Sequence, residues 1–397
     1  MSDDSDNLRV QIMILNAETK LQIEQESQKC TGCKVCMKNC PMLGAYCSDP
    51  KQLLQNLNLE GFNHTSKEAL QMPFSCTLCG SCDHVCPHGV ELSSVFYNMK
   101  KDIVAQIGFP QSFGKNALEF HQKNSFSKVF TTQVKPNKVK SRKIFFPGCS
   151  PSSHNPELIK RIYNHLNSHD ELDIMLKCCG NPTKSIGNHK QYTLFNDLLG
   201  SDFETLGVEE IVVLCMNCYN TLTKSYPHIK VTTIWEELLK YGLPDHNEES
   251  YKNIDITFAL HDPCPTRHHK ITHIAVRQVT EQMELKIDEF KFSKEKTVCC
   301  GSGAMLGLVH PTLSKQHKVK RSNQVQNEHI LTYCQECVES LKQGDKKTIH
   351  LLDLVFPNND VKQWNQRTKP VLKKWINRRK MKKISDGLRI EYLKKTT

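Results

Sequence analysis

The stretches KCCGNPTK (residues 177–184) and VCCGSGAM (residues 298–305) decide the fold of this chain, because each joins two adjacent cysteines to a glycine. Each pair is preceded by one cysteine and followed by a Cys-x-x-Cys, so five thiols recur in the same order. The two sets are Cys149, Cys178, Cys179, Cys215 and Cys218, then Cys264, Cys299, Cys300, Cys334 and Cys337. Adjacent cysteines strain a single tetrahedral ion, and structural zinc needs only four ligands. The pattern therefore predicts two multi-iron sites.

The two sets belong to a repeat with a period of about 119 residues. Each copy shows a short apolar run, a helical pattern and a second apolar run: residues 144–146, 156–166 and 211–214, then 256–260, 272–283 and 330–332. Strands that alternate with helices predict an α/β unit with a mainly parallel sheet. Loops beyond the carboxyl ends of such strands meet at one edge. We therefore expect the cysteines of each unit at one rim, with the two units facing each other across a pseudo-twofold axis.

Eight further cysteines precede the repeat in the spacing Cys-x-x-Cys-x-x-Cys-x-x-x-Cys-Pro, which occurs twice. This is the spacing of bacterial two-cluster ferredoxins, in which the fourth cysteine of each run binds the other cluster. The rule predicts one [4Fe–4S] cluster on Cys30, Cys33, Cys36 and Cys86, and another on Cys76, Cys79, Cys82 and Cys40. The 35 residues between the runs contain helical patterns, which favours a helical ferredoxin type. Cys47 is left over as a free or buried thiol.

The patterns predict a multidomain chain of 397 residues. We expect a helical ferredoxin-type domain at residues 1–126, a basic, solvated linker at 127–143, cysteine-rich domains at 144–250 and 251–357, and a basic tail at 358–397. The cysteine-rich domains are the α/β units with mainly parallel sheets.

The net charge of +11 comes from the end of the chain. Residues 361–397 hold 13 Lys and Arg against Asp386 and Glu391, whereas the rest has 40 basic and 40 acidic side chains. A nucleic-acid partner is therefore not expected. Apolar residues beside lysines predict a helix at 371–376. Three alternatives stay open for this helix. It binds an anionic membrane face or a partner, it folds back onto the body of the protein, or it is a solvated extension.

The acidic N-terminus lacks the features of a signal peptide, and the longest apolar runs are too short for a membrane helix. We therefore expect a cytoplasmic protein, with a peripheral place on the inner membrane face if the basic tail binds lipid. In a reducing compartment its thiols bind metal rather than form disulfides.

The order of these motifs resembles the D subunit of heterodisulfide reductase and its bacterial relatives, up to about residue 357. The resemblance implies two cubane [4Fe–4S] clusters, a non-cubane [4Fe–4S] cluster at each complete five-cysteine (CCG) set, and an oxidoreductase that reduces a heterodisulfide-type substrate. It also implies redox partner subunits: a flavoprotein, a membrane cytochrome or a quinone-reactive subunit. Similar chains serve glycolate, lactate and glycerol-3-phosphate dehydrogenases, so the alternative is a non-catalytic electron-transfer subunit that feeds quinone.

Cleavage of a disulfide needs proton donors, and two candidates lie beside the second five-cysteine set. His261 and Asp262 precede Cys264 and are the catalytic candidates, because a protonated side chain there delivers a proton to a departing thiolate. The alternative is that Asp262 caps a helix.

Overall fold

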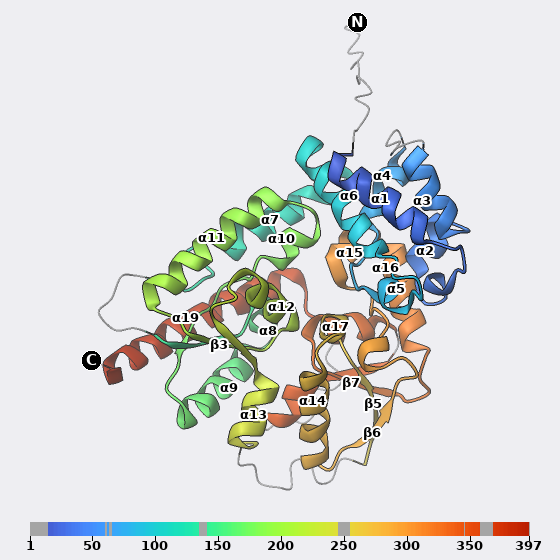
Figure 1. Ribbon diagram of the computed structural model, residues 1–397. Helices are drawn as coiled ribbons and strands as arrows, with labels where there is room; N and C mark the ends of the chain where they lie inside the picture. The colour runs from blue at the N-terminus through green and yellow to red at the C-terminus, as the bar shows by residue number, and fades with distance from the viewer. Residues whose placement is uncertain are drawn as a thin grey trace, which may run out of the picture.

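The computed structural model describes residues 15–59, 62, 66–134, 141–244, 255–344, 346–357 and 368–396. A helical N-terminal region is followed by two α/β units, and a long C-terminal helix lies against the first unit (Figure 1). The predicted multidomain layout is confirmed.

The described part of the N-terminal region contains helices and loops but no strand. The helices are α1 (Ala17–Lys29), η1 (Val35–Met37), α2 (Pro41–Tyr46), α3 (Pro50–Leu59), α4 (Lys67–Phe74), α5 (Ser81–Val85), α6 (Leu92–Ile107), η2 (Gln111–Phe113) and α7 (Lys115–Ser125). α6 is the central one, and its Val95, Phe96 and Met99 are buried. Asp102 ties α6 to the start of α1, because its carboxylate accepts hydrogen bonds from the backbone and side chain of Asn16.

The first α/β unit begins directly after residues 141–142. Its elements are β1 (Lys143–Phe146), α8 (Cys149–His154), α9 (Pro156–His169), β2 (Asp173–Ile174), α10 (Asn181–Ser185), α11 (His189–Leu206), β3 (Glu210–Val213), α12 (Met216–Ser225), β4 (Lys230–Thr233) and α13 (Ile234–Tyr241). The sheet is parallel, in the order β2-β1-β3-β4.

The second unit repeats this plan. Its elements are β5 (Thr257–His261), η4 (Cys264–Thr266), α14 (Lys270–Gln282), β6 (Lys286–Glu289), η5 (Lys294–Lys296), η6 (Gly303–Met305), α15 (Leu306–Val309), α16 (Pro311–Ser322), β7 (His329–Thr332), α17 (Gln335–Leu341), η7 (Lys342–Gly344), β8 (Lys347–His350) and α18 (Leu351–Val355). The parallel order β6-β5-β7-β8 matches that of the first sheet. The predicted parallel sheets are confirmed.

The two units share one apolar core. Helix α13 of the first packs against α14 of the second, and the Trp235 ring lies edge-on to that of Tyr333, 5.8 Å between centroids. The contacts are reciprocal: α12 of the first unit meets η4 of the second, and α17 of the second meets α8 of the first. This is the facing arrangement that a pseudo-twofold axis produces.

The segment at 127–143 is not uniformly solvated, contrary to the expectation. Thr131, Thr132 and Ser141 are buried, and Thr132 exchanges hydrogen bonds with the backbone of Leu176. These bonds hold the segment beside the sheet, although its lysines predict a solvated linker. Residues 135–140 lie outside the described part.

Lys143 is a partly buried cation of β1 rather than a linker residue. Its ammonium lies 2.8 Å from Asp170, 3.0 Å from Glu237 and 3.4 Å from Glu210. Burial disfavours its charge, but the carboxylates outweigh burial and raise the pKa of Lys143.

Replacing Lys143 with methionine should lower the free energy of unfolding at pH 7 by about 2 kcal/mol, because Glu237, only 4% exposed, loses its cation. Burial alone would raise the pKa of Asp170. Hydrogen bonds from Lys143 and Tyr241 outweigh burial, so the pKa of Asp170 is below its usual value. This stabilisation is present above the unfolded pKa and is lost as the pH falls through the folded one. The difference between variant and wild type should therefore shrink below about pH 4.

Urea unfolding at pH 7 and pH 3.5 measures this effect. Lys230→Met is the matched control, because Lys230 is 67% exposed and pairs with Glu210 at 3.3 Å; its cost should stay below about 1 kcal/mol. Equal costs for the two variants would contradict the buried network.

The C-terminal helix α19 (Val371–Thr396) folds back onto the first unit, which is one of the alternatives for the basic tail. Met381 is fully buried, and Arg389 lies 2.9 Å from the buried Asp173 of β2. The solvated-extension alternative is therefore wrong for α19. Val371 and Leu372, at its start, are exposed. No helix among the described residues has the length and apolarity to cross a membrane.

Candidate metal centres

The ferredoxin-type cysteines lie in two groups. One cavity is lined by five of them: Cys30, Cys33, Cys36, Cys86 and Cys82. Cys40 lies beside the cysteines of the second run, and burial together with the nearby Cys79 and Cys76 thiols raises the pKa of Cys40. The fourth cysteine of each run is thus next to the other run, as the ferredoxin rule requires. The assignment of each thiol to a cluster stays a prediction.

The two runs share a local backbone conformation. Gly32 and Lys34 have positive φ of 79° and 60°, and Leu78 and Gly80, at the same places in the second run, have 55° and 65°. Such turns direct backbone N–H groups towards an anion. The Leu78 N–H donates to the Cys76 Sγ at 3.4 Å. The sequence gives no sign of the positive φ at Lys34 and Leu78.

The first CCG set gathers at the carboxyl ends of the strands, as predicted. Cys149 starts α8 after β1, the Cys178–Cys179 pair follows β2, and Cys215 and Cys218 lie at the start of α12 after β3. The Sγ atoms of Cys149 and Cys178 are 3.8 Å apart. Hydrogen bonds from Cys178 and Cys218 outweigh burial and lower the pKa of Cys179 to about 5.

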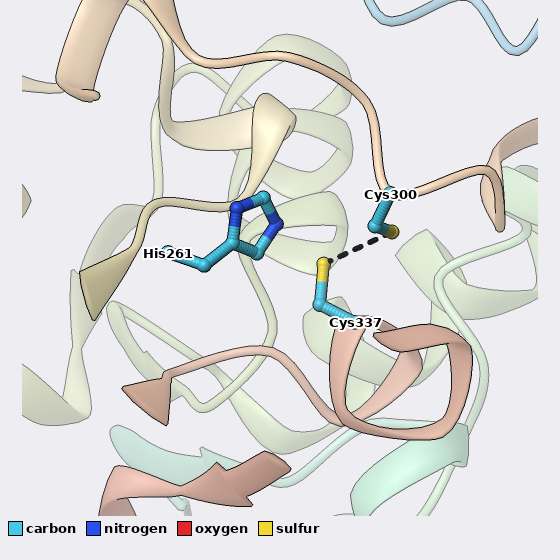
Figure 2. Close-up of side chains that lie close together, drawn as sticks. All are labelled: His261, Cys300 and Cys337. Atoms are coloured by element: carbon cyan, nitrogen blue, oxygen red, sulfur yellow. Dashed lines mark hydrogen bonds between the residues drawn. The ribbon is translucent and has the colours of Figure 1, made fainter. Parts of the chain in front are cut away.

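The second CCG set has the same placement, in η4, before η6 and at the start of α17. The Sγ atoms of Cys300 and Cys337 lie 3.3 Å apart (Figure 2). Hydrogen bonds with Cys299 and Cys337 hold the pKa of Cys300 well below its usual value. The Gly301 N–H donates to the Cys299 Sγ at 3.2 Å. Each unit therefore holds a contiguous group of thiols in which one cysteine has a lowered pKa.

His261 and Asp262 are both fully buried, and their role as proton donors stays a prediction. Burial, helped by the Arg321 charge, lowers the pKa of His261 well below its usual value. Burial acts to raise the pKa of Asp262, but Arg277, at 2.9 Å, and Tyr333 outweigh it and lower this pKa. Asp262 also accepts a hydrogen bond from the backbone of Lys294, the first residue of η5.

The second CCG set touches the ferredoxin domain. The thiols of Cys79 and Cys299 lie within hydrogen-bonding reach of each other, and this contact together with burial raises the pKa of Cys79. Arg267, which is 3% exposed, spans the contact. Its guanidinium donates to the Cys79 carbonyl at 3.1 and 3.2 Å and to the Thr297 carbonyl at 2.7 Å. No spacing in the sequence shows which unit meets the ferredoxin domain in this way.

The two CCG sets also meet each other. Glu336, between Cys334 and Cys337, accepts hydrogen bonds from the hydroxyls of Ser150, at 2.5 Å, and Ser302, at 3.2 Å. Ser150 follows Cys149. Glu336 is exposed, so solvent reaches the boundary between the sets. Sequence reasoning missed this carboxylate because only the fold brings Ser150 and Ser302 to it.

The donor groups fit iron–sulfur clusters. None of the 19 cysteines, all of them in described segments, forms a disulfide. Eighteen lie in the four groups above, and cysteine thiolates are the usual ligands of [4Fe–4S] clusters.

Comparisons with known proteins agree with these groups. Residues 29–91 match the 4Fe–4S dicluster domain, and residues 144–223 and 258–342 match the cysteine-rich domain CCG. An uncharacterized iron–sulfur protein of Methanococcus maripaludis is 26% identical over 82% of this chain and 71% of its own length. The B subunit of fumarate reductase (CoM/CoB) from Methanothermobacter marburgensis is 23% identical, over 71% of this chain and 60% of its own length.

The D subunit of dihydromethanophenazine:CoB–CoM heterodisulfide reductase from Methanosarcina acetivorans is 22% identical over 80% of this chain and 89% of its own length. No solved structure matches the chain. The chain thus belongs to the iron–sulfur proteins that join a 4Fe–4S dicluster domain to two cysteine-rich CCG domains, and it is related at low identity to the D subunit of heterodisulfide reductase.

Proposed function

We propose that this iron–sulfur electron-transfer subunit reduces a heterodisulfide-type substrate between its two CCG sites. Electrons reach those sites from two cubane [4Fe–4S] clusters in the ferredoxin domain. Both five-cysteine sets are complete, and the units that carry them face each other. Two sites that each pass single electrons suit the two-electron cleavage of a disulfide.

The contact between Cys79 and Cys299 is the observation that carries this proposal. Cys79 would bind a ferredoxin-type cluster and Cys299 the cluster of the second CCG site, so the contact of these two side chains would place the two cofactors close to each other. Buried Lys100 stabilises the ferredoxin side: its ammonium donates to the Cys76 carbonyl at 2.8 Å and to the Ser185 carbonyl of the first unit at 3.3 Å. The order of transfer is then ferredoxin domain, second CCG site, substrate.

A side chain at the boundary between the sites relays the protons. Cleavage of a disulfide by two electrons yields two thiolates, which take up two protons. Glu336 lies at the boundary between the sites, accessible to solvent and bonded to Ser150 and Ser302. We assign to its carboxyl group the transfer of protons from solvent to the departing thiolates.

The relatives bear the names of subunits of redox enzymes, so we also propose redox partner subunits for this chain. A flavoprotein suits the ferredoxin end as electron donor. A membrane cytochrome or quinone-reactive subunit is the other class of partner, and would bring the protein to the membrane surface.

Anaerobic oxidation in the presence of thiols tests the proposal. Coenzyme M and coenzyme B, the thiols named in the Methanosarcina relative, are added separately to the fully reconstituted protein. A paramagnetic species that forms only with thiol supports substrate binding at a cluster. Cluster spectra that no thiol changes would contradict it and favour an electron-transfer subunit of a flavin dehydrogenase. Glu336→Gln should keep all clusters and slow thiol release.

A further inference from the structure

We propose that His261 is a fixed hydrogen-bond donor to the sulfur atoms of the second CCG site, and that Arg321 is the residue that fixes it. The inference rests on the proposed cluster at that site. It gives His261 a role other than proton donor or metal ligand.

The imidazole of His261 faces the thiols. One ring nitrogen of His261 and the Sγ atoms of Cys300 and Cys337 all lie within 4.8 Å of one another, and all three residues are buried. His261 comes from the end of β5, Cys300 from the loop before η6 and Cys337 from α17. In Figure 2 the Nε2 edge of the ring is turned towards the two sulfurs.

Arg321 determines which ring nitrogen carries the proton. Its Nε and Nη2 lie 3.1 and 2.9 Å from the Nδ1 of His261. Arginine has no acceptor and keeps its charge in proteins, so Nδ1 must offer its lone pair. The proton of the neutral ring is therefore on Nε2. Arg321 is fully buried and stacks on Phe290, 3.9 Å from the ring centroid, so this arrangement is held firmly.

The Nε2–H group has no hydrogen-bond partner among the residues that the structure describes. A buried donor without a partner is costly and points to a ligand. The sulfurs in front of it become acceptors once they bind iron. A histidine that binds a metal through Nε2 usually donates its Nδ1–H to an acceptor. Here Nδ1 is itself an acceptor, so His261 is not an iron ligand.

The first unit lacks this donor. His261 pairs with Thr332 at the end of β5, and Phe146 pairs with Val213 at the matching position of β1. Both side chains are fully buried. At this strand position the second site therefore has an N–H donor where the first has a phenyl ring. Hydrogen bonds to cluster sulfur stabilise the added electron, so His261 raises the reduction potential of the second site.

The substitution His261→Phe places the residue of the first unit in the second. In the reconstituted protein, potentiometric titration followed by EPR should show the one-electron reduction of the second site to be about tenfold less favourable, which is 59 mV. The ferredoxin potentials should not move. His261→Gln, which keeps an amide N–H, should recover part of the shift. Phe146→Leu, the control in the first unit, should leave the second site unchanged.

Nitrogen-15 labelling of histidine tests the same point in the wild-type protein. A weak hyperfine coupling from one imidazole nitrogen to the second site, lost in His261→Phe, supports the hydrogen bond. A strong coupling indicates coordination and overturns the inference, as does an unchanged potential in a His261→Phe protein that retains its iron. If Cys300→Ser removes no iron, the proposed cluster itself is wrong, and this outcome is distinguishable from failure of the His261 role alone.

Discussion

Replacing Cys300 with serine should remove about four iron atoms per chain and the EPR signals of the second CCG site. Cys300 lies between Cys299 and Cys337, and hydrogen bonds with both hold its pKa well below the usual value, which favours metal binding through its sulfur. A serine hydroxyl stays protonated at neutral pH and is a poor iron ligand. The ferredoxin signals should persist, because none of their eight cysteines is altered. Iron and sulfide analysis, combined with EPR, measures the loss.

Cys47→Ser is the matched control. Cys47 lies outside the four groups, and its Sγ donates to the Leu43 carbonyl at 3.3 Å. Its iron content should equal that of the wild type. The assignment fails if Cys300→Ser keeps all its iron or if Cys47→Ser loses four. Loss of all iron from Cys300→Ser would contradict independent clusters and show that folding is coupled to assembly.

Gly187→Ala should weaken the packing of the ferredoxin domain against the first α/β unit. Gly187 has a φ of 86°, and a Cβ there would lie 2.5 Å from the backbone carbonyl of Lys100 in α6. The left-handed conformation costs alanine about 1–2 kcal/mol, and the clash with backbone adds to this. The free energy of unfolding should fall by at least about 2 kcal/mol. The carbonyl of Cys76 accepts a hydrogen bond from Lys100, so the proposed cluster on Cys76 should bind more weakly in this variant.

Thermal unfolding and the EPR of the ferredoxin clusters measure both effects. Gly387→Ala is the control: Gly387 is in α19, and nothing lies within 4 Å of its added Cβ. Alanine is the better helix former, so this variant should gain up to about 1 kcal/mol. A Gly187→Ala protein as stable as the wild type would show that the contact with α6 is not tight.

The sequence predicted the motif-bearing strands and the rim on which the cysteines gather, because apolar runs lead directly into Cys149, Cys215 and Cys334. It did not predict the outer strands of the sheets. β2 has two residues, Asp173 and Ile174, and β6 reads Lys-Ile-Asp-Glu, so neither shows an apolar run. Such strands are fixed by pairing with β1 and β5 rather than by their own composition.

The sequence also left the position of the basic tail undecided, because that position depends on a partner far away in the chain. Its lysines suggest solvent, and only the fold reveals that Arg389 meets the buried carboxylate of Asp173. Burial and the charges of Arg321 and Arg277 shift the pKa values of His261 and Asp262, and no spacing in the sequence indicates where these arginines lie. Distant partners of this kind decide whether a side chain is an acid, an acceptor or a donor.

Single-turnover reduction of a disulfide tests the central claim most directly. The reconstituted protein is reduced, freed of excess reductant and mixed anaerobically with the CoM–CoB heterodisulfide, glutathione disulfide or cystine. The account predicts that at least one of these oxidises the clusters and releases two thiols for every two electrons lost, and that Cys300→Ser abolishes the release. Clusters that stay reduced with all three disulfides, but are oxidised at once by a quinone, would contradict it.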